Sequence, residues 1–136
     1  DGSSNWLDTA MVNCANAATP GPQASCQTGE SNTVLLVSLN GSGSPSPYQA
    51  AEHCNGLSAH GYDDWYLPAS DELKVLYDNK NIGDLNGTFN EGPLSGRYWS
   101  STEANNQSAW SIRFSDKGQN GYQKNSTLRV RCIRKN

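Results

Sequence analysis

The side chains best suited to bind a ligand are basic, and most of them lie in the last third of the chain. Residues 97–136 contain eight Lys and Arg residues and two acidic residues, whereas residues 1–96 contain two Lys and eleven acidic residues. Arginine binds sulfate, phosphate and carboxylate groups through paired N–H donors, and lysine adds a point charge. In a chain of net charge −3, this asymmetry predicts a basic surface that binds a polyanion. The candidate binding residues are Arg113, Lys117, Lys124, Arg129 and Arg131.

Alternating sequence patterns indicate the strands that carry these arginines. Residues 109–115 and 128–134 each alternate apolar with polar side chains, as a half-buried strand does. Successive side chains of a strand point to opposite faces, so the arginines between the apolar positions are expected to point outward. If the two strands are neighbours, Arg113, Arg129 and Arg131 share one exposed face. The alternatives are a solvated strand face and a contact between subunits.

Four cysteines suggest disulfides rather than a metal site. They are Cys14, Cys26, Cys54 and Cys132. No two form a C-x-x-C pair, and His53 and His60 lack the spacing of zinc ligands. An even number in a small chain with little apolar material predicts two bridges and an oxidising compartment. Four buried free thiols in a cytosolic protein are the alternative, and three disulfide connectivities are possible.

The remaining signals favour a secreted binding protein without a cofactor. No nucleophile-elbow motif supports a Ser/His/Asp site, so we expect no enzyme activity. No run approaches the roughly 20 apolar residues of a membrane span. Asp1 has the character of a processed or excised start, which allows a larger parent protein. The acidic total and the disulfides make nucleic acid a poorer partner than a polysaccharide.

The elements that must position these residues are short. The chain has 136 residues, of which 35% are hydrophobic, and a mean hydropathy of −0.72. These values suit one loop-rich domain with a small core. The run from Thr33 to Leu39 predicts a buried strand within an N-terminal extension, residues 1–45. Residues 78–96 are rich in Asn and Gly and predict a long loop of the kind that often carries function.

Two helices are predicted in the middle of the chain. The first begins with Ser46 as its N-cap and turns Cys54 toward the core. The second follows Pro68 and buries a stripe that includes Leu73 and Leu76. Together with the strands of the last third, these helices predict an α+β domain.

The same segments, taken in order, resemble a known family. The matching strings are Tyr48-Gln-Ala-Ala-Glu-His-Cys54, Gly61-Tyr62-Asp63-Asp64-Trp65-Tyr66-Leu67-Pro68, Glu72-Leu73, Tyr98-Trp99-Ser100-Ser101-Thr102-Glu103, Ala109-Trp110 and Val130-Arg131-Cys132-Ile133-Arg134. In combination they resemble the C-terminal domain family of the Legionella collagen-like protein over residues 46–134, about two-thirds of the chain.

The resemblance implies a C-type-lectin-like fold over a single domain, residues 1–136. Such a fold has two helices, a small twisted antiparallel sheet and long loops. It commonly ties the first helix to the last strand, which here implies a Cys54–Cys132 bridge and leaves Cys14–Cys26 as the second.

The resemblance also implies a function. The family's namesake is a bacterial surface adhesin that binds sulfated glycosaminoglycans, and its collagen-like repeats imply a homotrimer, although this chain has no G-X-Y repeat. We therefore expect a secreted or cell-surface adhesin domain for sulfated polysaccharide. Neither the Glu-Pro-Asn nor the Trp-Asn-Asp signature of sugar-binding C-type lectins occurs, so we expect no calcium-dependent sugar binding. Ala69 stands where the family usually has a Ser or Thr helix cap, so Ser70 is expected to take that role.

A second resemblance supplies an alternative function. The segment from Trp99 to Cys132 is similar to the variable region of ligand-binding proteins that retroelements diversify, which implies a display domain for a protein ligand. The matching positions are Asn105, Asn106, Gln107, Asn120, Tyr122 and Asn125. Asn and Gly that only fill turns give the same pattern. A structural trimerisation or lipoprotein surface module with no ligand of its own is a third hypothesis.

The aromatic residues are expected to divide between the core and the surface. Trp65, Trp99 and Trp110 lie in the family motifs and are expected to pack in the core. Trp6, Tyr62 and Tyr122 are freer to contact a ligand.

Overall fold

The computed structural model describes residues 2–4, 28–38, 48–104, 108–124 and 126–135. Within these residues the chain forms helices and one sheet, so the predicted α+β class is confirmed. The strands are β1 (Gly2–Ser4), β2 (Arg97–Glu103), β3 (Ser108–Arg113), β4 (Gly118–Gln123) and β5 (Leu128–Val130), and the helices are α1 (Gly29–Ser38), α2 (Gln49–Asn55), α3 (Ser70–Asp78) and the 3-10 helix η1 (Gly83–Leu85).

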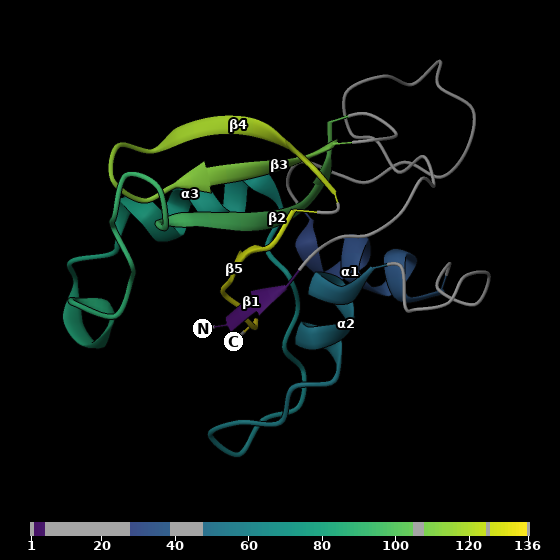
Figure 1. Ribbon diagram of the computed structural model, residues 1–136. Helices are drawn as coiled ribbons and strands as arrows, with labels where there is room; N and C mark the ends of the chain where they lie inside the picture. The colour runs from purple at the N-terminus through teal and green to yellow at the C-terminus, as the bar shows by residue number, and fades with distance from the viewer. Residues whose placement is uncertain (1, 5–27, 39–47, 105–107, 125, 136) are drawn as a thin grey trace.

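The described strands form one sheet in the order β1-β5-β2-β3-β4 (Figure 1). Strands β2, β3 and β4 are successively antiparallel, and β1 is antiparallel to β5. Strand β5 runs parallel to β2, so the prediction of a purely antiparallel sheet is wrong at this pairing. The chain leaves β4 at one edge and returns to the far side of β2, which gives β5 its parallel direction. In Figure 1, α3 lies behind β2 and β3, whereas α1 and α2 lie side by side.

In the described parts of the chain, two apolar clusters form the core, one on each face of the sheet. Tyr98 and Trp99 are consecutive in β2, so their side chains point to opposite faces. Tyr98 packs with Leu73 of α3 and with Phe114, and all three are fully buried. Trp99 packs in the other cluster with Leu36 of α1. The two motif aromatics therefore hold helices against both faces of the sheet.

Helix α1 shows that the strand predicted from Thr33 to Leu39 is wrong; Leu39 itself lies outside the described residues. A short apolar run fits a strand or a buried helix equally well, and tertiary contacts decide between them. The Thr33 hydroxyl donates to the carbonyl of Gly29 one turn earlier, at 2.8 Å, and accepts the N–H of Leu67 at 3.0 Å. Leu36, three residues further along the helix, is fully buried. These contacts favour the helical spacing.

Helix α2 places its cysteine as predicted. The helix begins three residues after Ser46, the predicted N-cap, which lies outside the described residues. Cys54 is fully buried and forms a disulfide with Cys132, with Cα atoms 5.4 Å apart. The Cys54–Cys132 pairing is thus confirmed, and it joins α2 to the segment after β5. Cys14 and Cys26 lie outside the described residues.

The side chain of Glu72, not that of the predicted Ser70, accepts the hydrogen bond from the backbone N–H at the start of α3. Ala69 is the N-cap and Ser70 is already helical. The Glu72 carboxylate accepts the N–H of Ala69 at 3.0 Å and the N–H of Gly29 at 2.7 Å, and the Tyr66 hydroxyl donates to it at 3.2 Å. A carboxylate suits this position because the N-terminal end of a helix is partially positive. A Cβ atom at position 29 would lie 2.5 Å from the Glu72 carboxylate, so only glycine allows this approach.

Buried polar groups explain the Ser-Ser-Thr part of the β2 motif. The side chain of Asn32 in α1 donates to the hydroxyl of Ser101 at 3.1 Å, and the Ser101 N–H donates to the carbonyl of Pro68 at 2.8 Å. The Ser70 N–H donates to the hydroxyl of Thr102 at 3.0 Å. Buried hydroxyls need such partners, and here they connect β2 to α1 and α3. This motif belongs to the scaffold.

Candidate functional site

The five predicted basic residues do not share one face. Strand β2 lies between β3 and β5, so the two arginine-bearing strands are not neighbours, and the condition for one shared face is not met. Arg113 is paired with Arg97, and Arg129 is paired with Tyr98, the next residue of β2. Because consecutive residues of β2 point to opposite faces, Arg113 and Arg129 also lie on opposite faces of the sheet. The strand order that separates them depends on a parallel pairing that the alternating pattern does not indicate.

Lys124 is buried, contrary to its predicted place on a binding surface. Its ammonium lies 3.0 Å from the carboxylate of Glu103, and the two side chains are 3% and 0% exposed. Glu103 ends β2 and Lys124 follows β4, so the pair closes one end of the sheet. The positive charge of Lys124 is balanced inside the protein and cannot reach a ligand in this structure.

Arg113 and Lys117 are partly exposed and are paired with carboxylates. The Arg113 Nε lies 2.9 Å from an oxygen of Asp116, and the Lys117 ammonium lies 2.8 Å from Asp78. Hydrogen bonding from Arg113, with a smaller contribution from the Gly118 N–H, lowers the pKa of Asp116 to about 2. Each of these two cations is thus balanced by a carboxylate, whereas Arg97, opposite Arg113 on β2, contacts the uncharged groups of Asn120 and Tyr122.

Arg129 and Arg131 lie together on the face that the 78–96 loop covers. The Nε of Arg129 donates to the carbonyl of Ser95 at 3.0 Å. Arg131 donates to the carbonyl and the hydroxyl of Thr88 at 3.1 and 3.0 Å. Burial raises the pKa of Tyr98, and the hydrogen bond that its hydroxyl accepts from the Asn90 N–H, together with the charges of both arginines, partly opposes this increase.

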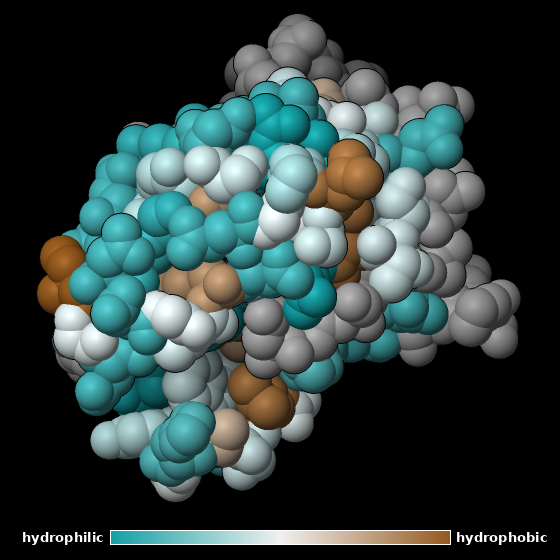
Figure 2. All heavy atoms as spheres, turned by 60° about the vertical axis from the view of Figure 1, so that its left-hand side comes forward, coloured by the Kyte–Doolittle hydropathy of each residue, from teal (hydrophilic) through white to brown (hydrophobic). Residues whose placement is uncertain are grey.

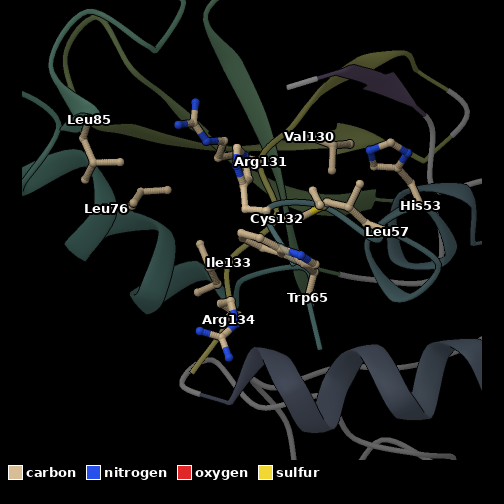
Figure 3. A pocket seen from close by; sticks show the side chains of 12 residues that line it. His53, Leu57, Trp65, Leu76, Leu85, Val130, Arg131, Cys132, Ile133 and Arg134 are labelled. Atoms are coloured by element: carbon tan, nitrogen blue, oxygen red, sulfur yellow. The ribbon is translucent and has the colours of Figure 1, made fainter. Parts of the chain in front are cut away.

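A pocket of about 640 Å³ opens beside Arg131 (Figure 3). We call it the Trp65 pocket, because the indole of Trp65 lies next to Cys132 in its middle. Apolar side chains form most of the lining, with two arginines and two histidines among them. The lining residues are His53, Leu57, Ala59, His60, Trp65, Leu76, Leu85, Val130, Arg131, Cys132, Ile133 and Arg134.

A tight turn builds one side of the Trp65 pocket. Ala59 and Tyr62 exchange two backbone hydrogen bonds, of 2.9 and 3.0 Å, around His60 and Gly61. Both central residues have positive φ, 55° and 82°, as a two-residue hairpin turn requires. The Trp65 Nε1 donates to the carbonyl of Tyr62 at 3.1 Å, and its ring meets the His60 ring edge-on at 6.3 Å. The turn therefore fixes the orientation of the indole.

Arg134, in the C-terminal segment, holds the same turn in place. Its guanidinium donates to both oxygens of Asp64, at 2.7 and 2.9 Å, and lies 3.6 Å from the ring centre of Tyr62. The hydrogen bond from Arg134 lowers the pKa of Asp64. Tyr66 and Ile133 exchange backbone hydrogen bonds of 2.7 and 2.9 Å, which hold the turn against the C-terminal segment.

Sequence reasoning missed the Trp65 pocket because it assigned Trp65 to the core. Trp99 is fully buried as expected, whereas Trp65 and Trp110 are only partly buried. Tyr62, expected to be freer, is 48% exposed and covers Arg134, whereas Trp6 lies outside the described residues. The dipeptide His60-Gly61 is the signal that could have indicated a tight turn here.

The positions of the diversified-receptor alternative are only partly described. Asn105, Asn106, Gln107 and Asn125 lie outside the described residues. Asn120 is exposed on β4 and accepts a hydrogen bond of 3.0 Å from Arg97, whose guanidinium also lies 5.0 Å from the ring centre of Tyr122. These two positions thus share the face that carries Arg97.

Three further observations bear on what the described part of the chain could bind or span. Among the described residues, no group of three or more His, Cys, Asp or Glu side chains could hold a metal ion. The face drawn in Figure 2 is mainly hydrophilic, and its hydrophobic atoms occur in separate small groups. No helix in the described parts of the chain is both long and apolar enough to span a membrane.

Comparison with known proteins places the chain in a family. The family described as the Lcl C-terminal domain matches residues 5–134. The match begins well upstream of residue 46, where the motifs quoted above start. Neither the curated proteins nor the solved structures give a significant match. Since the family match covers nearly the whole sequence, the chain belongs to the Lcl C-terminal domain family.

Proposed function

We propose that this chain is an extracellular adhesin domain with a C-type-lectin-like fold that binds sulfated polysaccharide and carries no catalytic activity. The observation that carries the proposal is the setting of Arg131. Its guanidinium lines the Trp65 pocket and contacts the polar groups of Thr88 and the ring of Phe89 at 4.3 Å. These partners are uncharged, so its positive charge remains available to an anion. Sulfate suits such a charge because guanidinium can donate two parallel hydrogen bonds to it.

The set of binding residues differs from the one predicted from the sequence. Arg129 and Arg131 remain, because they lie near each other on the loop-covered face. Lys124 leaves the set because it is buried against Glu103. Arg113 and Lys117 form a separate, charge-balanced edge, and we assign them at most a minor contribution.

A site that relies mainly on the charge of Arg131 implies weak binding by one chain. A homotrimer, as the family resemblance implies, would present three copies of the arginine pair to one long polymer. Linked sites raise avidity by a large factor without any new contact, provided that all can bind at once. We therefore include trimer formation in the proposal.

Heparin-affinity chromatography of the whole chain tests the proposal. The wild type is expected to be retained and to elute earlier as salt is raised, because ions screen exposed charges. Arg131→Ala should elute at lower salt, whereas Arg113→Ala, the matched control on the other face, should elute near the wild type. Absence of retention, or retention that salt does not change, would contradict polysaccharide binding.

A second candidate function is the diversified display domain. The exposure of Asn120 beside Tyr122 on one sheet face favours it, because side chains in this arrangement could be varied without disturbing the core. Its test is genetic. The gene should have adenine-rich codons at the Asn positions and a template repeat nearby, and a gene that lacks both would exclude this function.

A further inference from the structure

We propose that the Trp65 pocket binds a single pyranose ring that carries one anionic substituent, either a carboxylate or a sulfate. The inference rests on the proposed polysaccharide function and assigns it a specific site. In this arrangement, the pocket takes one acidic sugar unit of a chain, and Arg129 and other surface groups contact the neighbouring units.

The size and lining of the pocket fit a sugar ring. Its volume of about 640 Å³ lies within the range of roughly 300 to 1,000 Å³ that is usual for small-ligand sites. The C–H faces of a pyranose are apolar and pack well on an aromatic plane, and the partly buried indole of Trp65 provides one beside Leu57 and Ile133 (Figure 3). The lining thus combines an aromatic platform with a few polar groups, as such sites usually do.

The charge balance of the pocket indicates one anionic group on the ligand. Arg134 is neutralised by its two hydrogen bonds to Asp64. Arg131 contacts uncharged groups, so it supplies the net positive charge of the lining. The imidazoles of His53 and His60 can donate or accept hydrogen bonds, which suits them to sugar hydroxyls.

The rigidity of the pocket supports a binding role. His60 has a φ of 55°, in the left-handed region that is unfavourable for residues other than glycine. The turn persists because Trp65, Tyr62 and Arg134 hold it through the contacts described above. A site already fixed in its bound shape loses less conformational entropy when a ligand arrives. The strained turn is therefore consistent with a preorganised platform.

NMR titration of the whole, ¹⁵N-labelled chain tests the inference. The probes are glucuronate, galactose 6-sulfate and uncharged galactose, and the readout is the indole N–H signal of Trp65. Trp65→Phe assigns that signal by its loss and keeps an aromatic ring. We expect both anionic sugars to shift the signal and to bind at least about fivefold more tightly than galactose.

Two variants and one control separate the contributions. Arg131→Gln should reduce the preference for the anionic sugars, and Trp65→Leu should weaken binding of all three sugars about fivefold or more, as expected for the loss of a stacking contact. Trp110→Phe, which changes a partly buried indole outside the pocket, should leave the affinities unchanged. Resonances from the 59–65 turn report whether each variant keeps the fold.

The outcomes distinguish this inference from the proposed function. If heparin is retained on the column but no sugar shifts the Trp65 signal, the pocket assignment is overturned and the polysaccharide function stands. If the anionic sugars bind in the pocket but heparin is not retained, the pocket assignment stands and the polymer function falls. Equal binding of galactose and the anionic sugars would overturn the charge argument and with it the inference.

Discussion

Replacement of Lys124 by Met should destabilise the protein strongly, because it removes the ammonium that lies against the buried Glu103 carboxylate. The two charges are 3.0 Å apart. At an effective dielectric constant of about 20, Coulomb's law gives an attraction of about 5.5 kcal/mol at this distance, against about 1.4 kcal/mol in bulk water. Desolvation offsets much of this attraction, yet removal of one partner of a buried pair typically costs about 3–5 kcal/mol. We expect a loss in that range for Lys124→Met.

Urea denaturation measures this loss as a difference in the free energy of unfolding, from the midpoint and slope of each curve. The double variant Glu103→Leu with Lys124→Met removes both charges and should recover most of the stability, because apolar replacements of a buried pair are often neutral. Lys117→Met is the matched control. It breaks an exposed ion pair with Asp78 of similar length, with side chains 39% and 52% exposed, and should cost less than about 1 kcal/mol.

The reasoning is refuted if Lys124→Met and Lys117→Met lose the same stability, or if the double variant is less stable than Lys124→Met. Either result would mean that the pair is hydrated in solution. Lys124 would then return to the set of residues that can meet a ligand.

Two further predictions concern the scaffold. Replacement of Cys54 and Cys132 by Ala, which opens a bridge of sequence separation 78, should lower the free energy of unfolding by about 4.5 kcal/mol in the chain-entropy model; a loss below about 1 kcal/mol in urea would contradict it. Burial, with the nearby charge of Glu72, raises the pKa of Tyr66 to about 12. A raised folded-state pKa gives stability that is complete below the unfolded value near 10 and declines as pH rises toward 12. Ultraviolet titration at 295 nm should therefore find tyrosines, Tyr66 and Tyr98 among them, that ionise above the ordinary value near 10, and Tyr66→Phe should reduce the amplitude of this late step by one tyrosine.

Sequence patterns within single segments correctly predicted one helix and one strand. Helix α3 follows from its start after Pro68 and the burial of Leu73, and β3 follows from the alternation around Ile112. The pairing of Cys54 with Cys132 came from the family resemblance, because spacing alone leaves three possibilities.

The failures depend on contacts between distant residues. Helix α1 forms where an apolar run predicts a strand, because Thr33 bonds to Leu67, 34 residues away. The burial of Lys124 depends on Glu103, which lies in another strand. The pattern of apolar and polar residues within one segment cannot show a contact with a residue that is distant in the sequence. The predicted basic surface is not found for the same reason. Strand β5 pairs in parallel with β2, so β2 lies between the strands that carry Arg113 and Arg129.

The basic residues in the last third of the chain therefore do not form one surface. They have several separate structural roles. Lys124 closes one end of the sheet, Arg113 balances the charge of Asp116, and Arg134 fixes a turn through Asp64. Arg129 and Arg131 remain near the loop and the pocket. A count of charges overestimates the ligand charge that one chain can meet, because most of these cations already have anionic partners within the fold. Under the proposed polysaccharide function, recognition by a single domain should then depend on the shape of the Trp65 pocket and one charge, and we expect strong binding to a polymer to need several copies of the chain.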